Sequence, residues 1–405
     1  MNMEWSLPTY VHTVMETLRA AGHRGYLVGG SLRDLLRGRT PNDFDMTTDA
    51  TPEEMLEIFH AFRVIPTGLK HGTLTVLCEG APIEVTTHRV DGDYKDARRP
   101  ESVSFTRRLE EDLSRRDFTV NAMAWNPETG LVDPFDGQGD LARGILRAVG
   151  EPAKRFGEDA LRILRAFRFC AQLDFEIEPL TLQGAAAMRE GLARISVERI
   201  YAELAKLLEA PRVSRGLAAM RAAGCEKYVF LDTAPWIEPN VDVEALPAVA
   251  ALRLAALLPQ LPCEAALAFG RALHAPNVFG EGLAAYLAAA REPLPTTPFE
   301  ARRFTCSYWA QYEGALALRA ARGEEIGEAL ALCRRVAKDG SAVELRRLAV
   351  NGRELQEGCG VLPQQTATLL RRLQELVWEE PTRNKKQCLL SLATQICEKE
   401  RGFCE

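Results

Sequence analysis

Two glycines and a helix that follows them could bind a phosphate group near the start of the chain. Gly29 and Gly30 end a short apolar run, a pattern that predicts a strand entering a tight turn. Ser31 is expected to cap the helix Leu32–Arg37. Glycines before a helix N-terminus let backbone N–H groups approach a phosphate closely. Arg33, in the first turn of that helix, is expected to neutralise the same phosphate.

Two aspartates follow this turn and could bind a metal ion. Asp43 and Asp45 are separated by Phe44, so in a strand the two carboxylates share one face, and Phe44 and Met46 point to the core. Such carboxylates repel each other unless a cation lies between them, and Mg²⁺ accepts oxygen ligands of this kind together with substrate phosphates. The combination predicts metal-assisted phosphoryl or nucleotidyl transfer, although each part alone is typical of an ordinary turn or a solvated loop.

A third carboxylate, Glu84, lies between Ile83 and Val85 in the expected strand Pro82–His88. It could face the two aspartates across the sheet, or it could be an exposed strand residue. The other expected strands of this region are Phe62–Pro66 and Gly72–Cys78, which alternate or run apolar.

The segments LVGGSLRDLLRG (residues 27–38) and NDFDMTTDA (residues 42–50) resemble the active-site signature of the polymerase-β-type nucleotidyltransferases. In this form they are similar to the class II tRNA nucleotidyltransferase and bacterial poly(A) polymerase family. The resemblance implies that Asp43 and Asp45 hold two Mg²⁺ ions. Glu84 is a candidate third catalytic carboxylate on the strand pattern alone. It also implies a triphosphate cradle made by Gly29, Gly30, Ser31 and Arg33.

The segment RRDFTVNAMA (residues 115–124) matches the family motif for ribose and triphosphate contacts, which assigns Arg116, Asp117 and Asn121 to the nucleotide. Apolar spacing predicts a helix over residues 118–125. Arg115 and Arg116 would then lie at its N-terminus, where the macrodipole disfavours cations. A bound anion would relieve this, and so would exposure to solvent.

The polar segment 91–100 has no periodicity and reads as a loop. The resemblance implies that its residues Asp96, Arg98 and Arg99 belong to a flexible loop needed for the final A addition.

Glu158–Cys170 is expected to form one helix, with Asp159 and Arg162 as neighbours on one face. Cytosine and adenine each offer an amino donor beside a ring-nitrogen acceptor. A carboxylate can accept from the amino group, and an arginine can donate to the ring nitrogen. Uracil and guanine instead offer a carbonyl acceptor beside a ring N–H donor, so both contacts would be mismatched. The simpler interpretation is a surface salt bridge. The match to the family's E-D-x-x-R element favours base selection, and Arg165 is expected to join the nucleotide site.

Length and composition are those of a multidomain globular chain. It has 405 residues, 46% hydrophobic and 26% charged, and a net charge of −6, so a nucleic-acid partner must be met by local basic surfaces. It contains no apolar run of membrane-spanning length and no secretory signal. Ten cysteines without a C-x-x-C pair indicate reduced thiols and a cytoplasmic location.

The expected fold class is α+β, with a small nucleotidyltransferase head built on a mixed sheet and helices thereafter. The expected parts are a catalytic head (1–149), a helical neck that reads the base (150–210), a helical body (211–340) and a helical tail (341–405). The tail resembles that of the Bacillus-type members. It is locally basic, and its residues Arg371, Arg372, Lys385 and Lys386 are expected to bind tRNA, although basic helix faces are more often merely solvated.

The resemblance implies an enzyme that adds C, C and A to the 3′ end of tRNA from CTP and ATP, releasing pyrophosphate. The tRNA is expected to be held by its acceptor end and T-arm. Alternatives with the same chemistry are a poly(A) polymerase and a CC-only or A-only tRNA nucleotidyltransferase, and the intact loop argues against the CC-only form. An inactive tRNA-binding protein is an alternative from another class.

Overall fold

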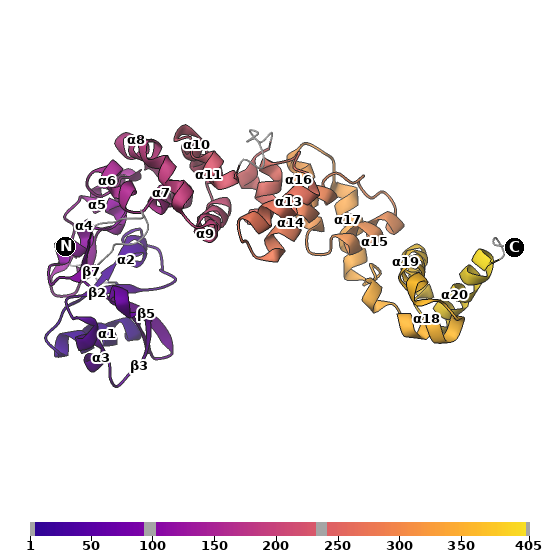
Figure 1. Ribbon diagram of the computed structural model, residues 1–405, viewed down its shortest axis with the longest axis horizontal. Helices are drawn as coiled ribbons and strands as arrows, with labels where there is room; N and C mark the ends of the chain where they lie inside the picture. The colour runs from indigo at the N-terminus through magenta and orange to yellow at the C-terminus, as the bar shows by residue number, and fades with distance from the viewer. Residues whose placement is uncertain (1–4, 93–102, 232–240, 402–405) are drawn as a thin grey trace. The chain divides into compact units, whose positions relative to one another are not determined.

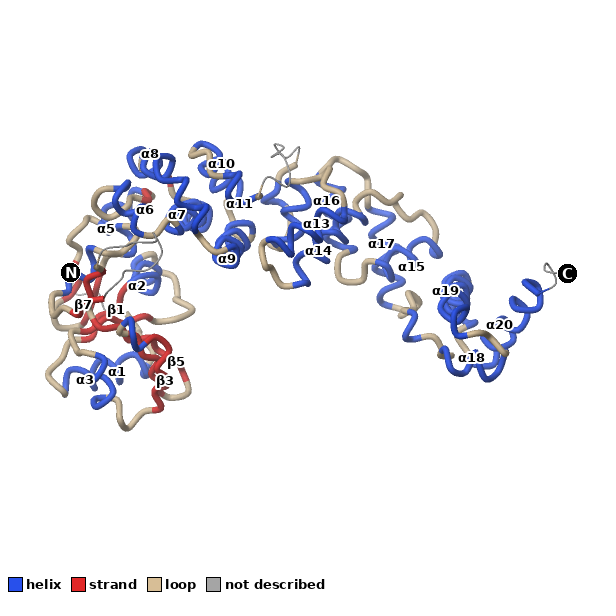
Figure 2. Tube along the Cα trace, viewed as in Figure 1, coloured by secondary structure: helices blue, strands red, loops and turns tan. Residues whose placement is uncertain are grey.

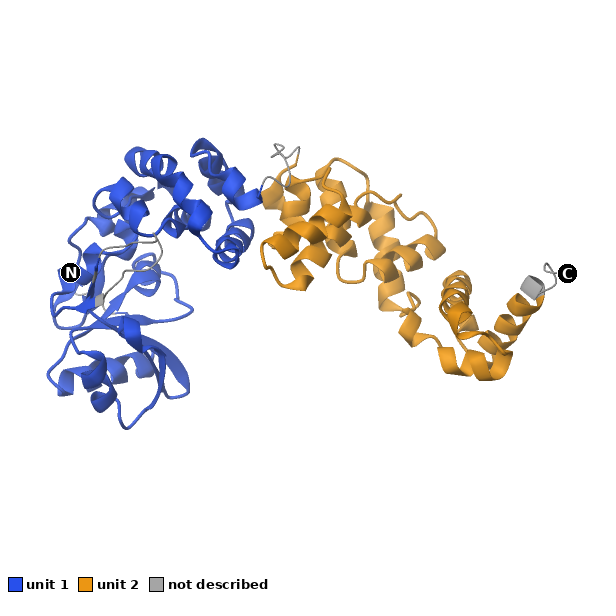
Figure 3. Cartoon of the chain, viewed as in Figure 1, with its two compact units in different colours: residues 1–233 blue, residues 234–405 orange. Residues whose placement is uncertain are grey.

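The computed structural model describes residues 5–92, 103–231 and 241–401. The chain forms two compact units, residues 1–233 and 234–405 (Figure 3). The expected head and neck lie in the first unit and the expected tail in the second. The segment 211–340, expected to be one body, is divided between them. The described strands all precede residue 178 (Figure 2), which confirms an α+β head followed by helices.

A seven-stranded mixed sheet forms the centre of the head. Strand β1 pairs antiparallel with β2 and β8, and β2 pairs parallel with β5. The β1–β2 register places Val28 opposite Asp45, so the end of one strand and the start of the other coincide. In order across the sheet, the strands are β3 (Arg63–Gly68), β4 (Thr73–Cys78), β5 (Ala81–Thr87), β2 (Asp45–Thr48), β1 (Gly25–Val28), β8 (Ala124–Asn126) and β9 (Gly130–Val132).

The main apolar core lies between this sheet and the helices α1 (Thr9–Ala20) and α3 (Pro52–Ile58) (Figure 1). Phe44 and Met46 are buried in it, which confirms the alternation expected around the aspartates. Helix α3 begins with a capping box, in which Thr51 and Glu54 satisfy each other's backbone N–H groups. Two further strand pairs join β6 (Arg89–Asp91) to β7 (Val103–Phe105) and β10 (Ile145–Leu146) to β11 (Glu176–Ile177).

Helix α2 spans Gly29–Leu36, so it begins three residues earlier than expected. The predicted cap at Ser31 is wrong, because its hydroxyl lies inside the first turn and donates to the Val28 carbonyl over 2.9 Å. Gly29 has φ +69°, a left-handed conformation that glycine adopts without a steric penalty. The two glycines therefore form the helix N-terminus itself.

The helix expected over residues 118–125 is also wrong. Helix α4 (Leu109–Ser114) ends before Arg115, and the chain continues through the 3₁₀ turn η2 (Thr119–Asn121) into β8. Arg115 and Arg116 therefore follow a helix C-terminus, where the macrodipole favours cations. Helix α5 (Gly137–Arg143) follows β9.

The neck is helical, but the single helix expected from Glu158 to Cys170 is interrupted. Asp159 is extended (φ −143°, ψ 105°) between α6 and α7, and its carboxylate accepts the Leu161 backbone N–H over 3.0 Å. A short acidic side chain that bonds nearby backbone in this way competes with helix continuation. The helices of the neck are α6 (Pro152–Glu158), α7 (Leu161–Leu173), α8 (Pro179–Met188), η3 (Arg189–Arg194) and α9 (Val197–Leu208), and the first unit continues with α10 (Val213–Ala222) and α11 (Glu226–Phe230).

Ser196 immediately precedes α9, and its side chain makes no capping hydrogen bond. Within the described parts of the chain, no helix is long and apolar enough to cross a membrane.

The second unit is built from helices. They are η4 (Val243–Ala245), α12 (Ala250–Leu257), α13 (Cys263–Ala272), α14 (Asn277–Ala289), α15 (Pro298–Ser307), α16 (Tyr312–Ala321), α17 (Gly327–Lys338), η5 (Leu345–Arg347), α18 (Gly352–Cys359), α19 (Pro363–Glu379), η6 (Pro381–Arg383) and α20 (Lys386–Arg401). Within the expected helical tail, residues 345–347 form only the 3₁₀ turn η5, whereas α19 has 17 residues and α20 has 16.

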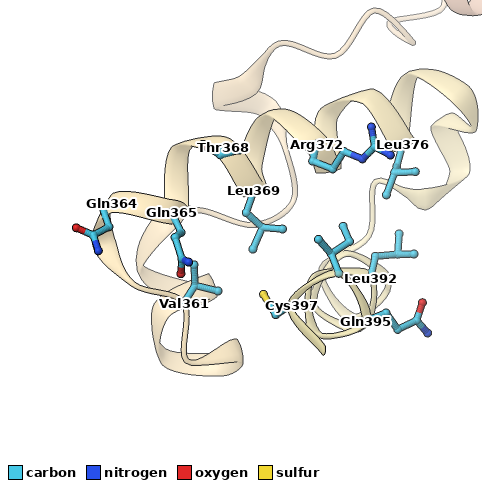
Figure 4. A pocket seen from close by; sticks show the side chains of 11 residues that line it. Val361, Gln364, Gln365, Thr368, Leu369, Arg372, Leu376, Leu392, Gln395 and Cys397 are labelled. Atoms are coloured by element: carbon cyan, nitrogen blue, oxygen red, sulfur yellow. The ribbon is translucent and has the colours of Figure 1, made fainter. Parts of the chain in front are cut away.

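A separate apolar core joins α18, α19 and α20. A pocket of about 640 Å³ lies between α19 and α20 (Figure 4). Arg372 is the only charged residue among the described residues that line it.

Candidate active site

Gly29 brings the phosphate turn into contact with two charged side chains. A Cβ at this position would lie 3.5 Å from Nη1 of Arg116 and 3.9 Å from Oδ2 of Asp45. One guanidinium and one carboxylate thus lie within 4 Å of the position that a Cβ would occupy at Gly29, at the start of the helix. This arrangement places hydrogen-bond donors for an anion beside a carboxylate, and transfer from a nucleoside triphosphate requires both kinds of group.

The two aspartates differ in their backbone settings. Asp45 is the first residue of β2, but Asp43 lies in the preceding bend and is exposed. The expectation that both occupy one strand face is therefore wrong for Asp43, because the strand starts two residues later. Glu84 is paired with Asp45 in the parallel β2–β5 ladder and is itself exposed. It is therefore both a neighbour of Asp45 and a solvent-facing strand residue.

Asp45 is electrostatically unfavourable as an anion. Burial, and then the negative charges of Asp43 and Glu84, raise the pKa of the Asp45 carboxyl to about 6, and Arg116 opposes them. A divalent cation would remove this penalty, and all three side chains offer the oxygen ligands that Mg²⁺ accepts. The residues therefore fit such an ion. The described residues contain no preformed cluster of three or more metal-ligating side chains.

Arg116 is held by Asp112, a residue that the sequence analysis did not single out. Asp112 is fully buried and accepts hydrogen bonds from Arg115 at 2.7 Å and Arg116 at 3.1 Å. Burial alone would raise the pKa of the Asp112 carboxyl, but the two guanidiniums hold it well below its usual range. Nε of Arg116 is buried and makes no hydrogen bond to any described residue. The spacing of Asp112 three and four residues before the arginines is the signal that could have identified it.

A second network joins four of the expected nucleotide residues. Nη1 of Arg33 donates to Asn121 over 2.8 Å, and Asn121 donates to Asp117 over 3.1 Å. Arg165 donates to the other oxygen of Asp117 over 2.8 Å. Burial would raise the pKa of Asp117, but Arg165 and Asn121 outweigh it and lower that pKa to about 2. The head and the neck helix are therefore joined through the Asp117 carboxylate.

The two expected base-reading residues have separate partners. Asp159 accepts a 2.8 Å bond from Arg199 of α9. Arg162 donates to Glu158 over 2.5 Å and to the Arg115 carbonyl over 2.8 Å. The simple alternative of a salt bridge between Asp159 and Arg162 is thus not found among the described ion pairs. Arg199 had no assigned role in the sequence analysis, and local spacing gave no signal for it.

The remaining expected sites lie elsewhere. Asp96, Arg98 and Arg99 fall outside the described residues. In the tail, all four basic residues are exposed. Arg372 pairs with Glu375 at 3.1 Å and Lys386 with Glu354 at 2.6 Å, whereas Arg371 and Lys385 form no ion pair with a described residue.

Two family models match the chain. Residues 25–147 match the Poly A polymerase head domain, and residues 174–237 match the probable RNA and SrmB-binding site of polymerase A. The chain is 51% identical over 207 residues to the Streptococcus suis CCA-adding enzyme, covering 51% of each protein. It is 47% identical over 216 residues to that of Geobacillus stearothermophilus, covering 53% of each. The match thus spans about half the length of these curated relatives.

The fold comparison extends over nearly the whole chain. A crystal structure of Bacillus stearothermophilus CCA-adding enzyme in complex with CTP superimposes with a TM-score of 0.80. Its sequence is 31% identical, and the match covers 98% of this chain and 99% of that one. With the shared head motifs and this full-length similarity, the chain belongs to the class II CCA-adding enzyme family.

Proposed function

We propose that this protein adds C, C and A to the 3′ end of tRNA from CTP and ATP, without a nucleic-acid template and with release of pyrophosphate. The observation that carries the proposal is the meeting of Gly29, Arg116 and Asp45 at one point of the head. Membership of the family supports the same reaction. The first solved relative was crystallised with CTP, which is one of the two proposed substrates.

In this reaction the 3′-hydroxyl of the tRNA attacks the α-phosphate of the nucleotide. The N-terminus of α2, with Gly29, Gly30 and Ser31, would hold the triphosphate, and Arg116 would neutralise it. Asp117 and Asn121 would hold the ribose and fix Arg33. Mg²⁺ at Asp43 and Asp45, with Glu84 beside them, would supply charge stabilisation and a lower pKa for the attacking hydroxyl.

Asp159 and Arg162 would select the base. The carboxylate would accept from the amino group of cytosine or adenine, and the arginine would donate to the ring nitrogen. Their anchorage supports this role, because Arg199 fixes Asp159 and Glu158 fixes Arg162. Two side chains held independently can present one acceptor and one donor to the base without neutralising each other.

The tail would bind the T-arm of tRNA through basic side chains, which sets a fixed distance to the acceptor end. Arg371 and Lys385 are the best candidates, since they are exposed and no described acid pairs with them. The described cysteines are free thiols, which supports a cytoplasmic location.

The test is incubation of the protein with tRNA that ends at the discriminator base. CTP alone should extend it by two residues, ATP alone by none, and the two together by three, ending in A. Long A tails on unstructured RNA would instead establish a poly(A) polymerase. Arrest after two C residues, or addition of A only to tRNA ending in CC, would identify the partial enzymes. Failure to incorporate any nucleotide while tRNA still binds would leave an inactive tRNA-binding protein.

A further inference from the structure

Phe169 of α7 is in contact with an unusual number of cations. The guanidinium carbons of Arg168, Arg165 and Arg33 lie 4.0, 5.2 and 5.3 Å from the centroid of its ring. The ring is only 6% exposed. Cation–π attraction is strongest where water is excluded, so these contacts are in a favourable setting.

These contacts close a circuit with the hydrogen-bonded network of the site. Starting from the ring, Arg33 reaches Asn121, Asn121 reaches Asp117, and Asp117 reaches Arg165, which returns to the ring. Arg33 belongs to α2 and Arg165 to α7. The circuit thus ties the helix of the phosphate turn to the helix that carries Arg162 and begins just after Asp159.

Both guanidiniums of the circuit are held by hydrogen bonds and by the ring. Asn121 accepts from one terminal nitrogen of Arg33, and Asp34 accepts from Nε of Arg33 and lies 3.0 Å from its other terminal nitrogen. Asp117 bonds Arg165 through Nε and Nη2. Fixing a long arginine side chain costs rotamer entropy. The aromatic face adds a constraint that both arginines share, because a guanidinium plane can stack on it.

We propose that Phe169 is a positioning residue of the nucleotide site. The face of its ring fixes Arg33 and Arg165 together, so that the triphosphate end and the base end of the nucleotide are presented at a constant separation. This inference rests on the proposed function, since it takes Arg33 and Arg165 to serve the nucleotide. No described atom of Phe169 itself needs to touch the substrate.

A purely structural role for Phe169 makes a different prediction. Its ring also packs edge-on against Phe118, with centroids 5.8 Å apart, as a core residue would. A core role depends on ring volume and shape, whereas cation–π attraction depends on the negative charge of the ring face. The two roles are therefore separable by changing the ring's charge distribution at nearly constant volume.

The experiment replaces Phe169 in the full chain by mono-, di- and trifluorophenylalanine. The matched control is the same series at Phe167, which is fully buried in the same helix. Among the described residues, no cation lies over the ring of Phe167. We expect KM for CTP and for ATP to rise with each added fluorine at Phe169. For the trifluoro ring KM should be about tenfold higher than for the unmodified protein, while kcat changes much less. The Phe167 series should leave KM unchanged.

A KM that stays flat across the Phe169 series, or that rises equally in the Phe167 series, would overturn the proposal. Calorimetry of CTP binding to the same proteins, without tRNA, tests the role of Phe169 independently of whether the protein extends tRNA. If the unmodified protein binds CTP but does not extend tRNA, the function is wrong, and the fluorine dependence of CTP affinity still decides the role of Phe169.

Discussion

Arg199 donates a 2.8 Å hydrogen bond to the carboxylate of Asp159 from a helix forty residues further along the chain. The bond orients Asp159 at the junction of α6 and α7, where its backbone is extended rather than helical. Arg162, the other proposed base-reading residue, is bound instead by Glu158. The orientation of the acceptor and that of the donor are therefore set by different neighbours.

We expect Asp159→Ala to lose discrimination against UTP and GTP and to slow incorporation of CTP and ATP. Each good base contact contributes about 1–3 kcal/mol of discrimination, so the preference should fall by about tenfold or more. Arg199→Ala should show the same loss in weaker form, since the carboxylate remains but is no longer oriented. Ratios of kcat/KM for the four nucleotides measure this. Lys206→Ala, exposed on the same helix as Arg199, is the control, and an unchanged preference in Asp159→Ala would leave that residue a purely structural role.

Asp45→Asn should abolish incorporation and yet stabilise the metal-free protein. The Asp45 pKa is raised to about 6 in the folded state, so the unfolded chain ionises first as the pH rises. Below about pH 4 the Asp45 carboxyl is protonated in both the folded and the unfolded state, so the variant and the wild type should be equally stable. Above pH 6 the free energy of unfolding of the variant should exceed that of the wild type by at most about 3 kcal/mol. Thermal unfolding with EDTA at pH 4 and 7.5 tests the sign, and Mg²⁺ should then stabilise the wild type only. Equal stabilisation of both proteins by Mg²⁺ would place the ion elsewhere.

Asp117→Asn should destabilise the protein in a pH-dependent manner. The pKa of Asp117 is lowered to about 2, so its ionised form stabilises the fold above the unfolded value near 4, and this contribution disappears as the pH falls through 2. The free energy of unfolding of the variant should be about 2 kcal/mol lower than that of the wild type at pH 7, and the difference should shrink progressively below pH 4. Urea unfolding at several pH values measures the difference. Glu313→Gln, which removes an exposed pair with Arg334, should show no such trend, and a pH-independent loss in Asp117→Asn would contradict the electrostatic explanation.

Arg371→Ala with Lys385→Ala should weaken tRNA binding more than Arg372→Ala with Lys386→Ala. The second pair of residues is already engaged with Glu375 and Glu354, and therefore has less charge to offer a phosphate. Loss of phosphate contacts reduces the slope of log affinity against log salt by about one per contact. Filter binding of tRNA over a salt series measures this slope. CTP affinity should be unchanged in both double variants. Equal salt slopes for the wild type and the two double variants would show that these tail residues do not bind tRNA.

Local patterns predicted the sheet better than they predicted the helix ends around the site. Phe44 and Met46 alternate with the aspartates as expected, because a strand with one buried face specifies that alternation. The start of α2 at Gly29 was missed, since glycine in a left-handed conformation reads as a turn in sequence. The break at Asp159 was missed because its apolar neighbours keep helical spacing through the interruption.

Contacts between distant segments left no local trace at all. Asp112 lies in the last turn of α4, three and four residues before its two arginines, and could have been found from this spacing. The contact of Arg199 with Asp159 and that of Phe169 with Arg33 could not, because the two partners are 40 residues apart in the first case and 136 in the second. Only the tertiary fold brings these groups to the nucleotide residues.

The β1–β2 register sets Val28 opposite Asp45. Because the proposed site depends on this register, enzyme activity can be used to detect whether the two strands are correctly aligned. A slip of one residue would turn the Asp45 carboxylate into the apolar core and expose Met46, so a sheet misaligned in this way would lose the carboxylate from the proposed site. In refolding experiments, circular dichroism would count slipped and correct sheets alike, whereas nucleotide turnover would count only correct ones. The ratio of the two recoveries therefore measures the fidelity of strand pairing in this fold.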